Sequence, residues 1–279
     1  VLTASASENQ DLFWGLRGGG GNFGVVVSFE FQAHPVGMVL GGLLVYPRAM
    51  AYDVLRNFRD FMKTAPDELT VYAAMLTMPD GMQVVAVIPC YCGDLEEGER
   101  VLAPLRAFGP PAMDAVQSLP FPVMQGLLAP SFPDGNHNYW KAVMMGTLPD
   151  EAIAAAVAQA NAATSPLSFV VIECYGGAAG RVANDMMAFP HRHLLWDVII
   201  AGQWTDAGET DRHRAWARAA AAALEPFADR GKLLAVLDYD DEDASPAFGS
   251  NRARLAEIKK KYDPENFFRV NQNIRVASA

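Results

Sequence analysis

The 279 residues suffice for one large domain or two domains of ordinary size, each with a substantial core. Of these residues 51% are apolar and 19% are charged, which is a globular rather than a disordered composition. The net charge of −10 argues against nucleic acid or an anionic membrane surface as partners. No apolar run approaches the about 20 residues that a membrane-spanning helix needs.

The three cysteines, Cys90, Cys92 and Cys174, give neither an even set for a disulfide framework nor the paired C-x-x-C pattern of a metal site. We expect them to be reduced and buried. The sequence begins at Val1 rather than at a methionine, and it shows no leader segment. We therefore expect a portion of a longer protein, with a cytoplasmic location favoured and the oligomeric state left open.

The predicted elements begin with a short helix over 8–17, followed by four glycines at 18–21. Residues 23–36, rich in Val and Phe, are predicted to form a strand, and residues 38–47 form the next. Apolar residues at three- and four-residue spacing then predict a helix over 50–63.

Two strands, 69–79 and 83–93, are predicted to meet at Asp80-Gly81, a pair typical of a hairpin turn. A helix follows at 94–109, and the proline-rich segment from Gly109 to Asn138 is predicted to be irregular. Beyond it the pattern predicts strands at 137–148, 166–177, 194–204 and 232–242, and helices at 149–162, 210–227 and 251–262. Hairpin-like strand pairs with flanking helices indicate an α+β fold with a largely antiparallel sheet.

Gly19, Gly21 and Gly24 match the G-x-G-x-x-G spacing of a dinucleotide-binding loop. That loop follows a strand and opens a helix, whereas here a helix comes first and a Val-rich strand follows. The acidic residue required about 20 positions further on is also absent. We therefore exclude a Rossmann fingerprint. Two alternatives stay open: a helix end that tolerates glycine, or a backbone that a ligand approaches closely.

Three stretches of the sequence carry a more specific signal. They are residues 8–36, the Ala-Phe-Pro-His-Arg segment at 188–192 with the strand ending at Trp204, and residues 254–274. The last contains Tyr-Asp-Pro-x-Asn-x-Phe-Arg-x-x-Gln-x-Ile. In this order they resemble FAD-linked oxidases of the berberine-bridge-enzyme-like group, within the vanillyl-alcohol-oxidase (PCMH-type FAD-binding) superfamily.

The resemblance implies a division of the chain into three parts. Residues 1–38 would end a PCMH-type FAD-binding domain, residues 39–240 would form the substrate-binding domain, and residues 241–279 would return to the FAD domain. The family's N-terminal half, which holds most of the pyrophosphate loop and the covalent tether to the flavin, has no counterpart here. The chain is thus expected to be a C-terminal portion.

The resemblance also implies an activity. Such enzymes transfer a hydride from an alcohol, amine or sugar-type small molecule to FAD, and oxygen then reoxidises the flavin. The residues carried over as cofactor-binding are Gly18, Gly19, Gly20, Gly21, Asn22, Phe23, Gly24, Val25, Asn271 and Asn273. The alternative is that the chain by itself is a non-catalytic fragment or a binding module without flavin.

The catalytic base is less clear from the motifs. The family often carries Tyr-x-Asn on the strand before the C-terminal helix, and here Val236 replaces the Tyr and Asp238 the Asn. Asp238 or Tyr239 is a candidate to compensate, because a carboxylate beside an apolar flavin pocket has a raised pKa suited to proton abstraction. The alternative is an acidic, solvated turn after the strand.

Asp197 is the one charged residue within the apolar strand predicted at 194–204. Charged residues rarely lie inside apolar strands unless they are paired or functional. Strand periodicity places Asp197 on the face shared by Ile199 and Ala201. Asp197 is therefore either a base or polar anchor that lines the pocket, or an edge-strand charge that faces water.

His191 follows Pro190 in a predicted loop, and we expect it to fix that loop by hydrogen bonding. The histidines show neither H-x-x-x-H nor H-E-x-x-H spacing, so we predict no metal site.

Overall fold

The structure, a computed structural model, describes residues 1–229, 231, 245–270 and 272–275. Its α-helices are α1 (Gln10–Leu16), α2 (Ala51–Met62), α3 (Leu95–Arg106), α4 (Phe121–Gln125), α5 (Asp150–Asn161), α6 (Gly177–Gly180), α7 (Thr210–Leu224), α8 (Ser245–Phe248) and α9 (Arg252–Tyr262). Its strands are β1 (Met38–Gly41), β2 (Leu44–Pro47), β3 (Leu69–Thr77), β4 (Gln83–Tyr91), β5 (Met113–Asp114), β6 (Gln117–Pro120), β7 (His137–Met145), β8 (Phe169–Cys174) and β9 (Trp196–Trp204).

The nine strands of the described part form one sheet in the order β5-β2-β4-β3-β8-β9-β7, with β1 beside β4 and β6 beside β1. Every strand pair among the described residues is antiparallel. The hairpin of β3 and β4 turns at the predicted place, where Gly81 adopts a φ of 88° that favours glycine. The predicted α+β fold with a largely antiparallel sheet is confirmed.

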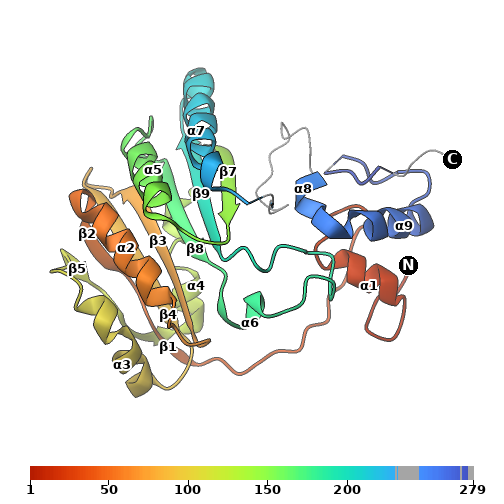
Figure 1. Cartoon of the computed structure of the whole chain (residues 1–279), viewed down its shortest axis with the longest axis horizontal. Coiled ribbons are helices and arrows are strands. Elements are labelled where there is room, and N and C mark those ends of the chain that lie inside the picture. Colours follow the sequence, from red (N-terminus) through yellow and green to blue (C-terminus); the bar gives the residue numbers. More distant parts are fainter. Residues whose placement is uncertain (230, 232–244, 271, 276–279) are drawn as a thin grey trace.

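One face of the sheet is covered by helices α2, α5 and α7, which lie side by side across it (Figure 1). Their apolar residues recur at helical spacing, so each helix turns one stripe inward: Val54, Leu55 and Phe58 on α2 are all 1% exposed or less. Burial of each such side chain contributes about 1.5–3 kcal/mol. This helix-covered face holds the main core of the protein.

The opposite face, called here the second face, carries the alternate residues of the same strands. Side chains alternate along a strand, so Tyr72 on β3, Glu173 on β8 and Asp197 on β9 all point to this side. A smaller apolar cluster that includes Ala74 and Ala86 packs there against the region of α4. The second face therefore combines apolar and acidic side chains.

A separate core lies beyond one end of the sheet, where α1 packs against α9 (Figure 1). Lys259 on α9 is fully buried, and its ammonium group donates to the Asp263 carboxylate at 2.6 Å. It also donates to the backbone carbonyls of Asn22 at 2.8 Å and Phe268 at 2.7 Å. One buried cation thus fastens α9 to the N-terminal loop and to the chain that follows the helix.

The strand predicted over 23–36 is wrong. This stretch runs as a single extended segment between α1 and β1, and no strand is assigned to it (Figure 1). Val25, Val27, Phe29 and Phe31 are 69–81% exposed. A strand needs a partner backbone, and no described residue pairs with this segment.

Two further expectations need comment. The strand predicted over 38–47 is two strands, because the chain bends at Gly42, where a Cβ would lie 2.1 Å from the Ala115 carbonyl oxygen. The strand predicted over 232–242 lies outside the described residues.

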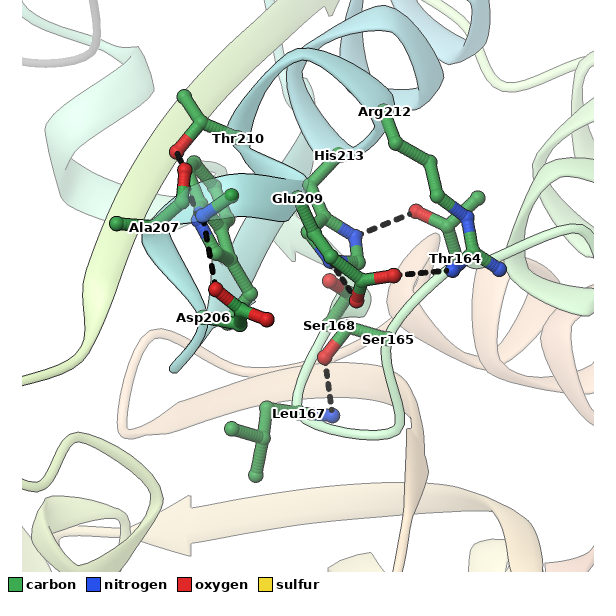
Figure 2. A network of polar contacts seen from close by, with 12 residues as sticks. Thr164, Ser165, Leu167, Ser168, Asp206, Ala207, Glu209, Thr210, Arg212 and His213 are labelled. Carbon is green, nitrogen blue, oxygen red and sulfur yellow. Dashed lines mark hydrogen bonds and ion pairs between the residues drawn. The ribbon is translucent and has the colours of Figure 1, made fainter.

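A polar network anchors the start of α7 (Figure 2). The buried His213 ring lies 2.8 Å from the Thr164 hydroxyl through Nδ1 and 3.3 Å from Glu209 through Nε2. The ring also stacks on Trp204 at a centroid distance of 5.2 Å. Both ring nitrogens have partners, so the network docks α7 on the loop before β8.

Candidate active site

The glycine-rich loop and the C-terminal segment, both predicted to bind cofactor, lie together and are joined by Asn22. The buried Asn22 amide donates to the Gly19 carbonyl at 2.8 Å and to the Gln272 carbonyl at 3.1 Å. The side-chain oxygen of Asn22 accepts the Ile274 backbone N–H at 2.9 Å. The polar groups of Asn22 are therefore used to position the loop against the segment.

Close packing accounts for two glycines of the loop, and backbone conformation accounts for a third. A Cβ on Gly18 would lie 2.3 Å from the Phe189 backbone nitrogen, and one on Gly19 would lie 2.5 Å from the Gly15 carbonyl oxygen. Gly20 has a φ of 68°, a left-handed conformation. The helix before the loop, and the absence of one directly after it, also agree with the exclusion of a Rossmann fingerprint.

Groups without a protein partner lie around the same loop. The side-chain oxygen of Asn273 is buried and has no hydrogen-bond partner. A Cβ on Gly24 would meet nothing within 4 Å, and Val25 is 79% exposed. A ligand that donates a hydrogen bond and covers apolar side chains fits this surface. Phe23, by contrast, is 6% exposed and packs in the core of α1 and α9.

Asp197 lies in the interior of the sheet, on β9 between β8 and β7. Its side chain points to the second face and is 0% exposed. The alternative of an edge-strand charge facing water is therefore wrong. Its Oδ1 atom is buried without a hydrogen-bond partner, and a buried carboxylate oxygen in that state costs free energy.

A second carboxylate faces Asp197 across the strand pair. Glu173 on β8 is directly opposite Asp197, and Tyr72 on β3 is directly opposite Glu173. The Tyr175 hydroxyl donates to Glu173 Oε2 at 2.5 Å and lies 3.4 Å from Asp197 Oδ2. We call Glu173, Tyr175 and Asp197 the acidic cluster.

Burial and mutual repulsion set the protonation of the acidic cluster. Burial, and then the negative charge of Glu173, raises the pKa of Asp197 to about 7. Burial also raises the pKa of Glu173, against the hydrogen bond from Tyr175. Burial and the hydrogen bond to Glu173 raise the pKa of the Tyr175 hydroxyl, which therefore keeps its proton. Asp197 thus gains and loses a proton near neutral pH, as an acid–base group must.

The loop between β8 and β9 connects this cluster to the glycine-rich loop (Figure 1). Its backbone N–H groups at Ala188 and Phe189 donate to the carbonyls of Trp14 and Arg17, each at 3.2 Å. The His191 ring contacts the Pro246 carbonyl at 2.7 Å, which confirms its expected role in fixing the loop. The loop between β8 and β9, held in place by these hydrogen bonds, therefore links the acidic cluster to the glycine-rich loop.

The sequence analysis identified Asp197 but not Glu173, which faces it. Glu173 is also a single charge in an apolar strand, Phe-Val-Val-Ile-Glu-Cys, so the rule that singled out Asp197 applies to it equally. What the local pattern lacks is the register that places Glu173 opposite Asp197.

Other candidate residues fall elsewhere. Asp238, Tyr239 and Asn271 lie outside the described residues. Cys92 is exposed, so the expectation that the cysteines are buried is wrong for that thiol, and Cys90 and Cys174 are only partly buried. Among the described residues, no three His, Cys, Asp or Glu side chains gather in a group able to hold a metal ion. No helix in the described ranges is long and apolar enough to cross a membrane.

Comparison with known proteins shows which proteins this chain is similar to. The family model "Berberine and berberine like" matches residues 238–275. An FAD-linked oxidoreductase of Dictyostelium discoideum is 27% identical over 96% of this chain and 59% of its own length. The (R)-6-hydroxynicotine oxidase of Paenarthrobacter nicotinovorans is 28% identical over 98% of this chain and 62% of its own length.

The fold is also similar to that of a solved structure. The structure of BBE-like 1 from Physcomitrella patens matches with a TM-score of 0.83 and 21% identity, over 99% of this chain and 62% of that one. The chain spans about three fifths of the length of the curated relatives that it matches. In motif and in sequence, the chain is thus similar to berberine-bridge-enzyme-like FAD-linked oxidoreductases, and its fold is similar to that of a solved member of that group.

Proposed function

We propose that this chain forms the substrate side of an FAD-dependent oxidase, which takes a hydride from a small alcohol, amine or sugar-type molecule and passes the electrons to oxygen. The observation that carries the proposal is Asp197, a fully buried carboxylate whose pKa is raised to about 7 and whose Oδ1 lacks a partner. The FAD-linked names of the relatives support the choice of cofactor.

The residues proposed to hold FAD are those of the glycine-rich loop, 18–25, together with Asn271 and Asn273. The fit rests on the buried, unpartnered oxygen of Asn273 and on the open space at Gly24. The two cores support the proposed division, in which residues 1–38 and 241–279 belong to the FAD-binding part and 39–240 to the substrate-binding part: Ala188 alone among the buried residues of the smaller core lies in 39–240. When bound, FAD supplies the two-electron acceptor for the hydride.

The chain's own contribution is the handling of a proton. A carboxylate oxygen of Asp197 accepts the proton from the substrate's O–H or N–H group. The lone pair left on that oxygen or nitrogen then assists departure of hydride from the neighbouring carbon. Tyr175 donates to Glu173 and fixes that carboxylate beside Asp197. Ile199 and Val171, next along the second face, form an apolar floor that excludes water.

The proposal is tested with the flavin-loaded protein. Under anaerobic conditions, a small-molecule substrate is expected to bleach the visible absorbance of the flavin, and admitted oxygen is expected to restore it. Asp197→Asn is expected to retain bound flavin and lose the bleaching. A folded full-length protein that takes up no FAD contradicts the proposal.

A second candidate is that these 279 residues alone bind no flavin and act only with further polypeptide. The exposed apolar side chains of residues 25–31, whose backbone pairs with no strand of the described residues, favour it. Titration of the isolated chain with FAD separates the two candidates: tight binding followed by turnover contradicts the second.

A further inference from the structure

We propose that Cys90 and Cys92 form a reversible dithiol–disulfide pair, which closes when the protein meets a peroxide. The pair lies at the end of β4, and strands β3 and β8 separate β4 from β9, which carries Asp197. The proposal goes beyond the proposed function and does not depend on it, because peroxide added to the purified chain tests it without flavin.

The first step in the argument is the distance between the two sulfur atoms. Sγ of Cys90 lies 3.8 Å from Sγ of Cys92. Cys90 is within β4, opposite Thr70 on β3, and Cys92 follows the last residue of the strand. A disulfide brings the two sulfurs to about 2.05 Å. Rotation of the exposed Cys92 side chain supplies the remaining approach.

The second step is the backbone around Cys92, which the fold holds in place. The Cys92 N–H donates to the Glu68 carbonyl at 2.8 Å. Two residues further on, the Asp94 side chain caps α3 by accepting the Glu97 N–H at 2.9 Å. The short distance between the sulfurs is therefore a property of the folded chain.

The third step is the difference in surroundings between the two thiols. Cys92 is exposed, whereas Cys90 is half-buried. Burial, and then the negative charge that Cys92 carries as a thiolate, raises the pKa of Cys90 to about 12, so the Cys90 thiol keeps its proton. Because oxidation of cysteine follows exposure and thiolate character, Cys92 reacts with peroxide first and Cys90 completes the bridge.

The third cysteine does not compete for either sulfur. Cys174 is on β8 and packs against the main core on the helix-covered face. Cys90 is opposite Thr70, two positions before Tyr72, so its side chain lies on the second face. The odd number of cysteines thus leaves one close pair and one separate thiol.

The reaction balances with hydrogen peroxide as the oxidant. The Cys92 sulfur attacks one peroxide oxygen and the O–O bond breaks, which gives a sulfenic acid at Cys92 and one water. The Cys90 sulfur then displaces the hydroxyl group, which takes the Cys90 proton and leaves as a second water. Two thiols are oxidised by two electrons, and the peroxide is reduced to water.

Mass spectrometry of the purified chain, treated with hydrogen peroxide and digested with trypsin, tests the proposal. Cleavage after Lys63 and Arg100 leaves both thiols in the peptide 64–100. We expect this peptide to lose two hydrogens under peroxide and to regain them with dithiothreitol, while Cys174 keeps its thiol. Glutathione in the same solution shows that the oxidant is active.

Three results from the unaltered chain would overturn the proposal. They are a peptide 64–100 that stays reduced while glutathione is oxidised, a bridge that forms only between two chains, and loss of the Cys174 thiol as fast as that of Cys92. None of these measurements requires a substitution, so a variant that fails to fold leaves the test intact.

Serine variants test the separate roles of the two sulfurs. Cys92→Ser should slow loss of the Cys90 thiol at least about tenfold, because the exposed sulfur is gone. Cys90→Ser should leave a sulfenic acid at Cys92, which dimedone traps. The matched control, Cys174→Ser, should form the bridge at the original rate. Equal loss of the Cys90 thiol in Cys92→Ser and in the unaltered chain, or no trapped sulfenic acid in Cys90→Ser, would contradict the proposal.

Discussion

Two buried aspartates in this protein have opposite surroundings. Asp263, after α9, is 5% exposed and receives hydrogen bonds from the Lys259 ammonium at 2.6 Å and from the backbone N–H groups of Phe267 and Phe268 at 2.8 and 3.0 Å. Asp197 is 0% exposed, faces another carboxylate and keeps one oxygen without a partner.

The difference appears in the two pKa values. Burial acts to raise the pKa of Asp263, but the hydrogen bonds from Lys259 and the two backbone groups hold it below the ordinary value. At Asp197 burial and a like charge act together, and its pKa rises to about 7. Burial alone thus does not tell a structural acid from a reactive one; the partners do.

The largest expected effect is on catalysis. Asp197→Asn removes the proton acceptor and should lower the rate of flavin reduction by about 10²–10⁴-fold, a typical contribution of general-base catalysis. In the unaltered enzyme, the rate should rise with pH through about 7 as Asp197 loses its proton. Stopped-flow absorbance measures both, with exposed Asp53→Asn on α2 as the control. A rate within about threefold of the original contradicts a role as base.

The next effect is on stability, at the other aspartate. Lys259→Met leaves the Asp263 carboxylate buried without its cation and should lower the free energy of unfolding by about 3–5 kcal/mol. Urea denaturation measures it. Lys260→Met, at the exposed neighbouring position, should change it by less than about 0.5 kcal/mol. Equal losses in the two variants would remove the contrast between the aspartates.

Asp197→Asn, unlike Lys259→Met, should increase the free energy of unfolding. The folded-state pKa of about 7 exceeds the ordinary 3.8, so stability falls as pH rises between these values and the cost of ionising Asp197 is complete above about 7. At pH 8 the variant should therefore be more stable by about 2–4 kcal/mol, and the gain should vanish near pH 4. Thermal unfolding at the two pH values checks this. A loss of stability at pH 8 would show that Asp197 is satisfied in solution.

The smallest expected effect is the acid response of Asp263. Because its folded-state pKa is lowered, its contribution is present above the ordinary value of 3.8 and is lost as pH falls through the folded-state value. The original chain should therefore lose stability more steeply below pH 3.8 than Lys259→Met, in which the depression is relieved. Acid titrations of the two proteins, followed by circular dichroism, check this. If the Lys259–Asp263 pair contributes nothing, the two proteins will lose folded structure with equal steepness as pH falls.

The sequence predicted local elements and local anomalies, but not the partners that distinguish the two aspartates. Helices α1, α2, α3, α5, α7 and α9 and strands β3, β4, β7, β8 and β9 follow from local periodicity, and the α+β sheet follows from them. The segment 109–138, predicted to be irregular, instead contains β5, β6 and α4. Asp197 stood out because a charge in an apolar strand is a local anomaly. Glu173 is the same anomaly, but its importance depends on the register of β8 against β9, which is a property of two segments 24 positions apart.

The segment 23–36 failed for a related reason. Its Val and Phe content fits a strand, yet strand formation requires a partner, and composition does not say whether one is present. The glycines at 18 and 19 invited an interpretation as a ligand path, whereas their first requirement is the close approach of Phe189 and Gly15. In both cases the structure depends on whether another part of the chain lies close by, which the local sequence pattern does not reveal.

The same exposed segment has a practical consequence for handling the protein. Phe29 and Phe31 stack on each other at 5.5 Å while both face solvent, in an extended backbone that no described strand caps. Such a stretch is a template for pairing with its own copies, and Glu30 is its one charge between Val25 and Phe31. We expect the purified chain to self-associate through it at high concentration and high salt, where the mutual repulsion of chains carrying a net charge of −10 is screened.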